Sequence, residues 1–278
     1  MQVIQYDTAA EFLARAKSWL EVTEAENNLI LGISKYFASH SGRINVDPYF
    51  FTVEDAGKLL GAALMAPPRN SIISRMPQSG LVALADYYLE NAISIPGVVG
   101  PKNTIRLFAD YWKTRTGTAF HTKMSQRIYA CERVLTRTYA RGHLRPATKD
   151  DEPLATQWAA AFCRDAGIGD EIEAMTARIP NIIETGSLYV WDNDQIVSTA
   201  LVQRETTHGI SISMVYTPAH LRNRGYATSC VAAVTQRMLD SGKTFCCLYT
   251  DLTNPTSNSI YQKIGYKPIC DSEDLAFE

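Results

Sequence analysis

Residues 210–239 run from an alternating strand pattern through a basic turn into a helix pattern, and this succession restricts the fold more than any other stretch. The alternating apolar positions of the strand are Ile210, Ile212, Met214 and Tyr216. From Ala227 the apolar spacing becomes that of one helical face, until Ser241 and Gly242 end the helix. The segment is therefore a strand–turn–helix unit with one apolar face on each element, as in a mixed α+β domain.

The turn between these elements, residues 222–227, has the chemistry of a phosphate site. The first N–H groups of a helix lack backbone partners, and the helix dipole favours an anion there. Gly225 has no side chain, so an anion can approach its backbone closely. Arg222 and Arg224 add charges that pair well with phosphate oxygens. The alternative is that both arginines are solvated loop residues.

A second block of recognisable spacing follows downstream. Asn254 and Pro255 are typical of a helix N-cap followed by proline at the first helical position. Tyr261 lies seven residues after Asn254, and Gly265-Tyr266 then ends the helix and begins another strand.

The two blocks, in this order, resemble the Gcn5-related N-acetyltransferases (GNAT family) over residues of about 145–278. The resemblance implies that the turn binds the pyrophosphate of acetyl-coenzyme A, with Arg222, Gly225 and Ala227 at the fixed positions. The implied cofactor-binding residues are Met214, Val215, Tyr216, Thr217, Arg222, Asn223, Arg224, Gly225, Tyr226, Ala227, Thr228, Asn254, Asn258 and Tyr261. The interval from Pro218 to Gly225 is one residue longer than the family's commonest spacing, which leaves open which arginine meets the phosphate.

The resemblance also implies a reaction, the transfer of an acetyl group from acetyl-coenzyme A to a primary amine of a small molecule or peptide, by direct attack in a ternary complex. The backbone of 214–217 would pair with the pantetheine arm, and an N–H near Val215 or Tyr216 would face the thioester oxygen. Tyr261 would be the catalytic acid for the departing thiolate. A core tyrosine is the alternative for Tyr261. Alternatives for the function are a non-catalytic acyl-coenzyme A binding or sensing module, and an acyltransferase with a longer acyl donor.

The sequence does not identify a general base or the amine acceptor. Glu184, Glu205 and Asp251 are carboxylates near the ends of expected strands or helices, and each is also typical of a surface residue. His208 and His220 fall in loops. A chain of water molecules is the remaining alternative for the base.

The two halves of the chain share a pattern of elements without sharing sequence. Each half shows two helices, a hairpin, and then strand–helix–strand–helix–strand. We therefore expect a mixed, mostly antiparallel central sheet flanked by helices in two tandem acetyltransferase-like domains. Residues 1–140 would form a degenerate domain, since 77–80 (Pro-Gln-Ser-Gly) stand where the basic turn belongs and Lys102-Asn103 is a poor substitute. Residues 141–278 would bind acetyl-coenzyme A. A single larger α+β domain is the alternative.

Two local expectations concern helices outside these blocks. The residues from Thr23 to Glu26 have the spacing of a capping box and predict that a helix begins there. A further helix is expected over residues 171–184.

The composition limits the classes of binding partner and the cellular compartment that we expect for the protein. The net charge is -2, whereas a general nucleic-acid binder carries a strong basic excess. No apolar run is long enough to span a membrane, and the N-terminal residues do not resemble a signal peptide. The six cysteines are scattered without metal-ligand spacing, so we expect no metal and a reducing, cytoplasmic setting. The expected assembly is a monomer or a homodimer.

Overall fold

The computed structural model describes residues 1–40, 46–136 and 139–278, which separate into two compact units. The first unit comprises Met1–Tyr129 together with Tyr249–Pro255 and Pro268–Glu278. The second comprises Ala130–Leu248 and Thr256–Lys267. Each unit is thus built from separate stretches of the chain, and the unit boundaries fall inside strands β6 and β11. The assignment of the cofactor site to residues 141–278 and of a degenerate domain to residues 1–140 stays a prediction.

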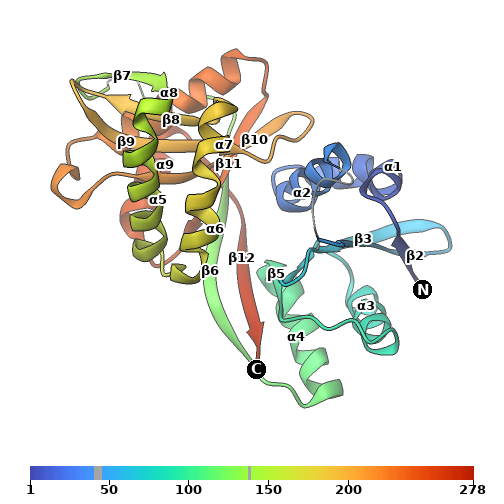
Figure 1. Cartoon of the computed structure of the whole chain (residues 1–278). Helices are drawn as coiled ribbons and strands as arrows, with labels where there is room; N and C mark the ends of the chain where they lie inside the picture. The colour runs from blue at the N-terminus through green and yellow to red at the C-terminus, as the bar shows by residue number, and fades with distance from the viewer. Residues whose placement is uncertain (41–45, 137–138) are drawn as a thin grey trace. The chain divides into compact units, whose positions relative to one another are not determined.

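The first unit is a sheet with helices on both faces, visible as separate layers in Figure 1. Its strand order is β1-β2-β3-β4-β5-β12-β6. The strands are β1 (Gln2–Tyr6), β2 (Tyr49–Asp55), β3 (Lys58–Met65), β4 (Ser71–Ile73), β5 (Gly97–Pro101), β6 (Phe120–Cys131) and β12 (Lys267–Phe277). The helices are α1 (Ala9–Leu20), α2 (Asn28–Ser39), α3 (Gln78–Glu90) and α4 (Lys102–Thr116). Strands β4 and β5 pair in parallel, and β12 pairs antiparallel with β5.

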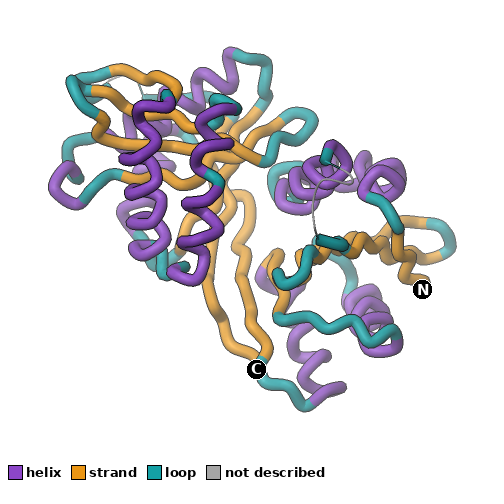
Figure 2. The backbone as a smooth tube through the Cα atoms, in the orientation of Figure 1, coloured by secondary structure: helices purple, strands orange, loops and turns teal. Residues whose placement is uncertain are grey.

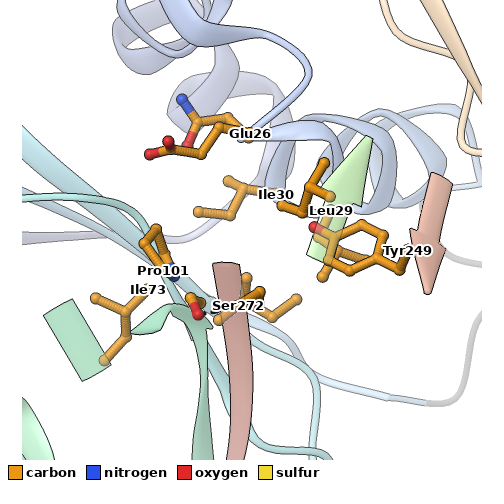
Figure 3. A pocket seen from close by; sticks show the side chains of 11 residues that line it. Glu26, Leu29, Ile30, Ile73, Pro101, Tyr249 and Ser272 are labelled. Carbon is orange, nitrogen blue, oxygen red and sulfur yellow. Dashed lines mark hydrogen bonds between the residues drawn. The ribbon is translucent and has the colours of Figure 1, made fainter. Parts of the chain in front are cut away.

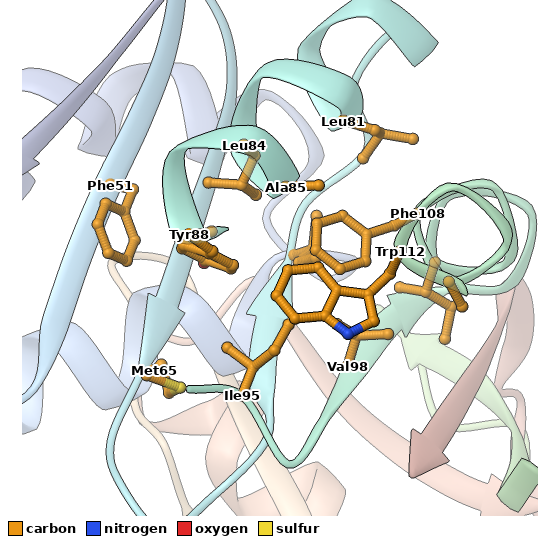
Figure 4. Close-up of a cluster of buried hydrophobic side chains, with 14 of the residues drawn as sticks. Phe51, Met65, Leu81, Leu84, Ala85, Tyr88, Ile95, Val98, Phe108 and Trp112 are labelled. Carbon is orange, nitrogen blue, oxygen red and sulfur yellow. The ribbon is translucent and has the colours of Figure 1, made fainter. Parts of the chain in front are cut away.

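Side chains of β2 and β3 point alternately to the two faces of this sheet and contribute to a hydrophobic core on each face. Phe50 and Leu64 pack with α1 and α2 on one face. The neighbouring residues Phe51 and Met65 point to the other face and pack with α3 and α4, as Figure 4 shows. Successive side chains of a strand point to opposite faces, which explains the division.

The second unit has the strand order β11-β10-β9-β8-β7. The strands are β7 (His143–Pro146), β8 (Leu188–Asp192), β9 (Ile196–Gln203), β10 (Gly209–Tyr216) and β11 (Phe245–Asp251). The helices are α5 (Glu152–Asp165), α6 (Ile172–Ala177), α7 (Ile179–Glu184), α8 (Tyr226–Asp240) and α9 (Pro255–Ile264). Within this unit β10 is parallel to β11 and antiparallel to β9, and the other described pairs are antiparallel. Figure 2 shows helices and strands of this unit as separate layers.

The expected fold class is confirmed, because both units are mostly antiparallel sheets flanked by helices. Two local expectations are wrong. The helix expected from the Thr23–Glu26 spacing begins at Asn28, and the carboxylate of Glu26 instead binds Arg75. The helix expected over residues 171–184 is two short helices that meet at Arg178, because Pro180 cannot continue a helix from the preceding turn.

Candidate active site

Strand β10 changes its pairing and its shape along its length. Its described parallel register with β11 covers only the first residues, Gly209 to Ser211, although both strands continue beyond this register. Its register with β9 shifts between Ser213 and Tyr216. Within this bulge Met214 has a φ of 46°, in the left-handed region that non-glycine residues rarely adopt. Strained backbone of this kind is often found at functional sites, and the bulge interrupts the regular pairing of β10 with β9.

The side chain of Met214 explains how the bulge is held. It is 4% exposed and packs in the core of the second unit with residues of α5 and α7. On the far side of the bulge, the Ser198 hydroxyl donates to the carbonyl of Tyr216 at 3.1 Å, and the Thr217 hydroxyl donates to Ser198 at 2.9 Å. The end of the strand is therefore anchored on both sides of the distortion.

The turn at residues 217–225 connects β10 to helix α8. Gly225 is the N-cap of α8, with a φ of 79°, and no side chain in the described part of the chain caps the helix. A side chain at Gly225 would have room, since the nearest atom to its Cβ would be that of Ala140 at 3.8 Å, but its backbone conformation favours glycine. Within the described residues, the first N–H groups of this helix therefore meet no capping side chain. The residues present fit an anionic group at this position.

The two arginines of the turn differ in how they are held. The Nε of Arg222 donates to the carbonyl of Thr217 at 2.9 Å, and its Nη2 donates to Asp165 at 2.6 Å. Arg222 and Asp165 are about half exposed, at 48% and 53%. Arg224 is exposed, as is Asn223, whose φ of 63° marks the tightest point of the turn. Arg222 is therefore pre-oriented by the loop and by α5, whereas Arg224 projects into solvent.

The predicted site residues that follow the turn in sequence are divided between the two units. Asn258 and Tyr261 belong to α9 in the second unit, and Asn254 lies in the segment Tyr249–Pro255 of the first. Asn254 is exposed and Asn258 is half-buried. The structure thus brings residues 214–228 together as one continuous segment, and the approach of Asn254 to that segment stays a prediction.

Tyr261 is a buried tyrosine whose hydroxyl bonds to none of the described residues. It is 8% exposed, and its ring lies edge-on to Tyr266 with the centroids 5.9 Å apart. Burial raises the pKa of Tyr261 to about 12. Among the residues that the structure describes, no hydrogen-bond partner reaches its hydroxyl, whereas the hydroxyls of Tyr266 and Thr235 lie 2.7 Å apart. Tyr261 is protonated at neutral pH, so its hydroxyl is a hydrogen-bond donor.

The carboxylates and histidines considered as general bases have surface positions. Glu205 pairs with Lys243, and Asp251 accepts bonds from the backbone N–H and the hydroxyl of Thr253 at 2.7 and 2.8 Å. Glu184 is exposed at the end of α7. His208 and His220 are also exposed. None of these side chains is therefore identified as the general base.

Sequence reasoning missed Asp165, which holds Arg222, and Trp158, whose ring lies 5.7 Å from that of Tyr216. Both residues belong to α5, more than fifty positions before their partners, so no local spacing could have revealed them. In the described residues no cluster of three or more potential metal ligands occurs. None of the described helices is both long and apolar enough to cross a membrane.

Comparison with known proteins agrees with this geometry. The family model described as FR47-like protein matches residues 194–274, which contain β10, the turn, α8 and α9. The sequence matches no curated protein. A GNAT-family acetyltransferase from Colwellia psychrerythraea is 12% identical, with a TM-score of 0.59, and the match covers 100% of this chain and 99% of that one.

Two further solved structures are similar over nearly the whole chain. A GCN5-related N-acetyltransferase from Sphaerobacter thermophilus is 15% identical, with a TM-score of 0.61, over 99% of this chain and 95% of that one. A tandem GNAT protein from the clavulanic acid biosynthesis pathway is 10% identical, with a TM-score of 0.59, over 100% of this chain and 98% of that one. The resemblance predicted from the two sequence blocks is confirmed: the chain has the fold of tandem GNAT proteins, with an FR47-like segment at residues 194–274.

Proposed function

We propose that the chain is an N-acetyltransferase that uses acetyl-coenzyme A and acts on a primary amine. The observation that carries the proposal is the bulged strand β10 followed by the uncapped N-terminus of α8 at Gly225. The bulge interrupts the pairing of β10 where an extended ligand could bind, and the helix start supplies N–H groups for its phosphates. The fold of tandem GNAT proteins supports the same activity.

In this proposal the pyrophosphate of acetyl-coenzyme A binds at residues 222–228. Backbone N–H groups of Gly225 to Thr228 donate to its oxygens, and Arg222 supplies charge from its position beside Thr217. The pantetheine arm extends along the backbone of 214–217, where Met214 distorts the strand. Asn254, Asn258 and Tyr261 complete the cofactor site.

Acetyl-coenzyme A supplies the thioester, and the protein supplies position and hydrogen bonds. A backbone N–H near Val215 or Tyr216 donates to the thioester oxygen as negative charge develops on it. The neutral amine attacks the carbonyl carbon, the carbon–sulfur bond breaks, and one proton leaves the amine while one reaches sulfur. Tyr261 donates a hydrogen bond to the departing sulfur as negative charge develops there, and the thiolate takes up its proton from solvent.

A non-catalytic acyl-coenzyme A binding module is the second candidate, and Tyr261 favours it. A pKa of about 12 makes this phenol a reluctant acid. Both candidates require the turn at Gly225, and only the enzyme releases free thiol when an amine is supplied. A panel of primary amines, assayed by thiol release from acetyl-coenzyme A, separates them. If acetyl-coenzyme A binds but no amine causes thiol release, the chain would be a binding module.

The first prediction tests the cofactor site with Gly225→Glu. A carboxylate in the place of the anion would weaken binding by about 1–4 kcal/mol, on the order of 10–10³-fold. Calorimetry of the wild type should show about one acetyl-coenzyme A per chain, because the basic turn occurs once in the sequence.

A matched control is available at the other end of α8. Gly242 has a φ of 100° and open space around its Cβ position, so Gly242→Glu introduces the same charge and a similar backbone strain. Wild-type affinity in Gly242→Glu and weak binding in Gly225→Glu would support the site. Equal affinity in both variants, or two equal sites per chain, would contradict it.

A further inference from the structure

The first unit contains a hollow where β5 passes into α4. It is lined by Arg75, Pro101, Lys102, Asn103, Cys270 and Asp271 and has a volume of about 250 Å³. One water requires roughly 10–15 Å³ on the same measure, so the hollow admits a small molecule. The neighbouring pocket of Figure 3 shares Pro101 but has only about 10 Å³, room for a single water at most. We call the larger space the cationic hollow.

The cations of this hollow lie above buried carboxylates. Arg75 donates from Nε and Nη2 to Glu26 at 3.2 and 3.0 Å, and the two side chains are 59% and 8% exposed. Lys102, 42% exposed, pairs with Glu273, which is 1% exposed, at 3.1 Å. Both cations thus keep one side in an ion pair and present the other to the hollow.

Charge is not balanced around Glu273. Its carboxylate accepts two bonds from Arg106, at 2.5 and 3.0 Å, in addition to its pair with Lys102. Asp271 is matched by Arg127, which donates twice to it at 2.6 and 3.1 Å. Glu273 is therefore satisfied by Arg106 alone, and the ammonium of Lys102 is the surplus positive charge at the hollow.

The remaining lining groups are donors. Lys102 and Asn103 belong to the first turn of α4, whose N-cap is Pro101 and which no described side chain caps. The Asn103 amide and the N–H groups of this turn add to the charge of Lys102. The thiol of Cys270 has its pKa raised to about 12 by burial and by the carboxylate of Glu26, so it is uncharged at neutral pH and does not repel an anion.

We propose that the cationic hollow binds a small oxyanion, a carboxylate or a phosphate group, with Lys102 as its principal charge partner and Arg75 and Asn103 as further donors. Each of three carboxylates nearby has a cation other than Lys102, so Lys102 is the charge that an incoming anion meets. The proposal is independent of acetyl transfer and of the site in the second unit.

Cys270 provides a readout within the hollow itself. It is the one cysteine of the six that is not fully buried. In the experiment the full chain is alkylated with iodoacetamide, an uncharged reagent, and modification of Cys270 is followed by peptide mass mapping. Inorganic phosphate, malonate and chloride are compared at matched ionic strength and at a constant pH near 9. We expect one of the two oxyanions to slow alkylation saturably, by about tenfold at ten times its dissociation constant, while chloride does not.

Variants of Lys102 locate the effect. Lys102→Met should abolish the protection, and Arg106 still satisfies Glu273 in this variant, so the fold is retained. Lys102→Arg keeps the charge and should keep the protection. Lys113→Met, in the last turn of the same helix, is the matched control and should behave as wild type. Phosphate protection indicates a phosphate ligand, and malonate protection indicates a carboxylate. Equal rates in all three salts, or protection that persists in Lys102→Met, would overturn the proposal.

Discussion

Two buried tyrosines, Tyr261 and Tyr266, lie edge to face, and only Tyr266 has a hydroxyl bonded within the described chain. The Tyr261 hydroxyl is therefore available to a ligand. Proton transfer from a phenol of pKa about 12 to a thiolate of ordinary pKa is uphill by roughly 5 kcal/mol, so a hydrogen bond to the sulfur is its expected contribution.

For Tyr261→Phe we expect a fall in turnover of about 10²–10³-fold, the usual effect of losing one donor to a developing negative charge, with acetyl-coenzyme A affinity and melting temperature close to wild type. The hydrogen bond strengthens only as charge develops on sulfur, which explains the unchanged affinity. Because the folded pKa is about 12, the donor stays protonated below that value, so turnover should show no loss from Tyr261 between pH 7 and 10. Thiol-release kinetics and a thermal melt measure these quantities.

Tyr266→Phe is the control for this experiment. It removes a hydroxyl that lies 2.7 Å from that of Thr235, at an expected cost of about 0.5–1.5 kcal/mol in the free energy of unfolding, with turnover retained. Tyr261 would have no catalytic role if Tyr261→Phe kept turnover within about threefold of wild type.

At the scale of elements, α5 holds the turn that follows β10. Asp165, the last residue of α5, binds Arg222, and Trp158 from the same helix lies against Tyr216 at the end of β10. A cofactor phosphate at the turn must share Arg222 with Asp165. The ion pair is half exposed, and such pairs contribute about 0.2–1 kcal/mol.

Asp165→Asn should therefore tighten acetyl-coenzyme A binding by up to about fivefold, because it removes a competing negative charge while Thr217 still orients Arg222. Calorimetry at low and high salt measures the change, which should shrink as salt rises. Asp240→Asn, which removes an equal charge at the far end of α8, is the control and should bind as wild type. Weaker binding in Asp165→Asn would instead show that the carboxylate is needed to order the loop.

Particular residues show how far the sequence predicts these elements. Gly225 and Pro255 mark helix starts by their own backbone chemistry, and both helices begin where expected. The bulge at Met214 could not be predicted, because an alternating strand pattern gives no sign of a shifted register. The local spacing of a capping box predicts a helix-cap role for Glu26, whereas its observed partner Arg75 is 49 residues away. Ion pairs between distant segments depend on the folded topology.

At the scale of the whole molecule, the first unit depends on the last strand of the chain. Strand β12 pairs with β5 from Ser272 to Ala276, and Leu275, 0% exposed, packs in the core with α3 and α4. The backbones approach so closely that a Cβ at Gly97 would lie 2.1 Å from the Leu275 carbonyl oxygen. Residues 268–278 are thus part of the unit that begins at Met1.

Leu275→Ala should destabilise the first unit by about 2–5 kcal/mol, the usual range for removing a buried leucine side chain. Native-state hydrogen exchange should show lost protection in β2 and β3, although these strands lie more than two hundred residues earlier in the sequence. Ile269→Ala, on the same strand but 46% exposed, should change stability by less than about 0.5 kcal/mol. Retained protection of β2 and β3 in Leu275→Ala would contradict the role of β12.

The place of β12 also affects how the protein is made. During translation β5 and β6 emerge long before β12, and residues 132–266 must be synthesised between them. At 5–20 residues per second this interval lasts on the order of ten seconds. Throughout it the edge of β5 has no β12 to cover its backbone groups, a condition that favours pairing with other nascent chains. The β5 edge of the nascent first unit is therefore open to incorrect pairing until β12 emerges.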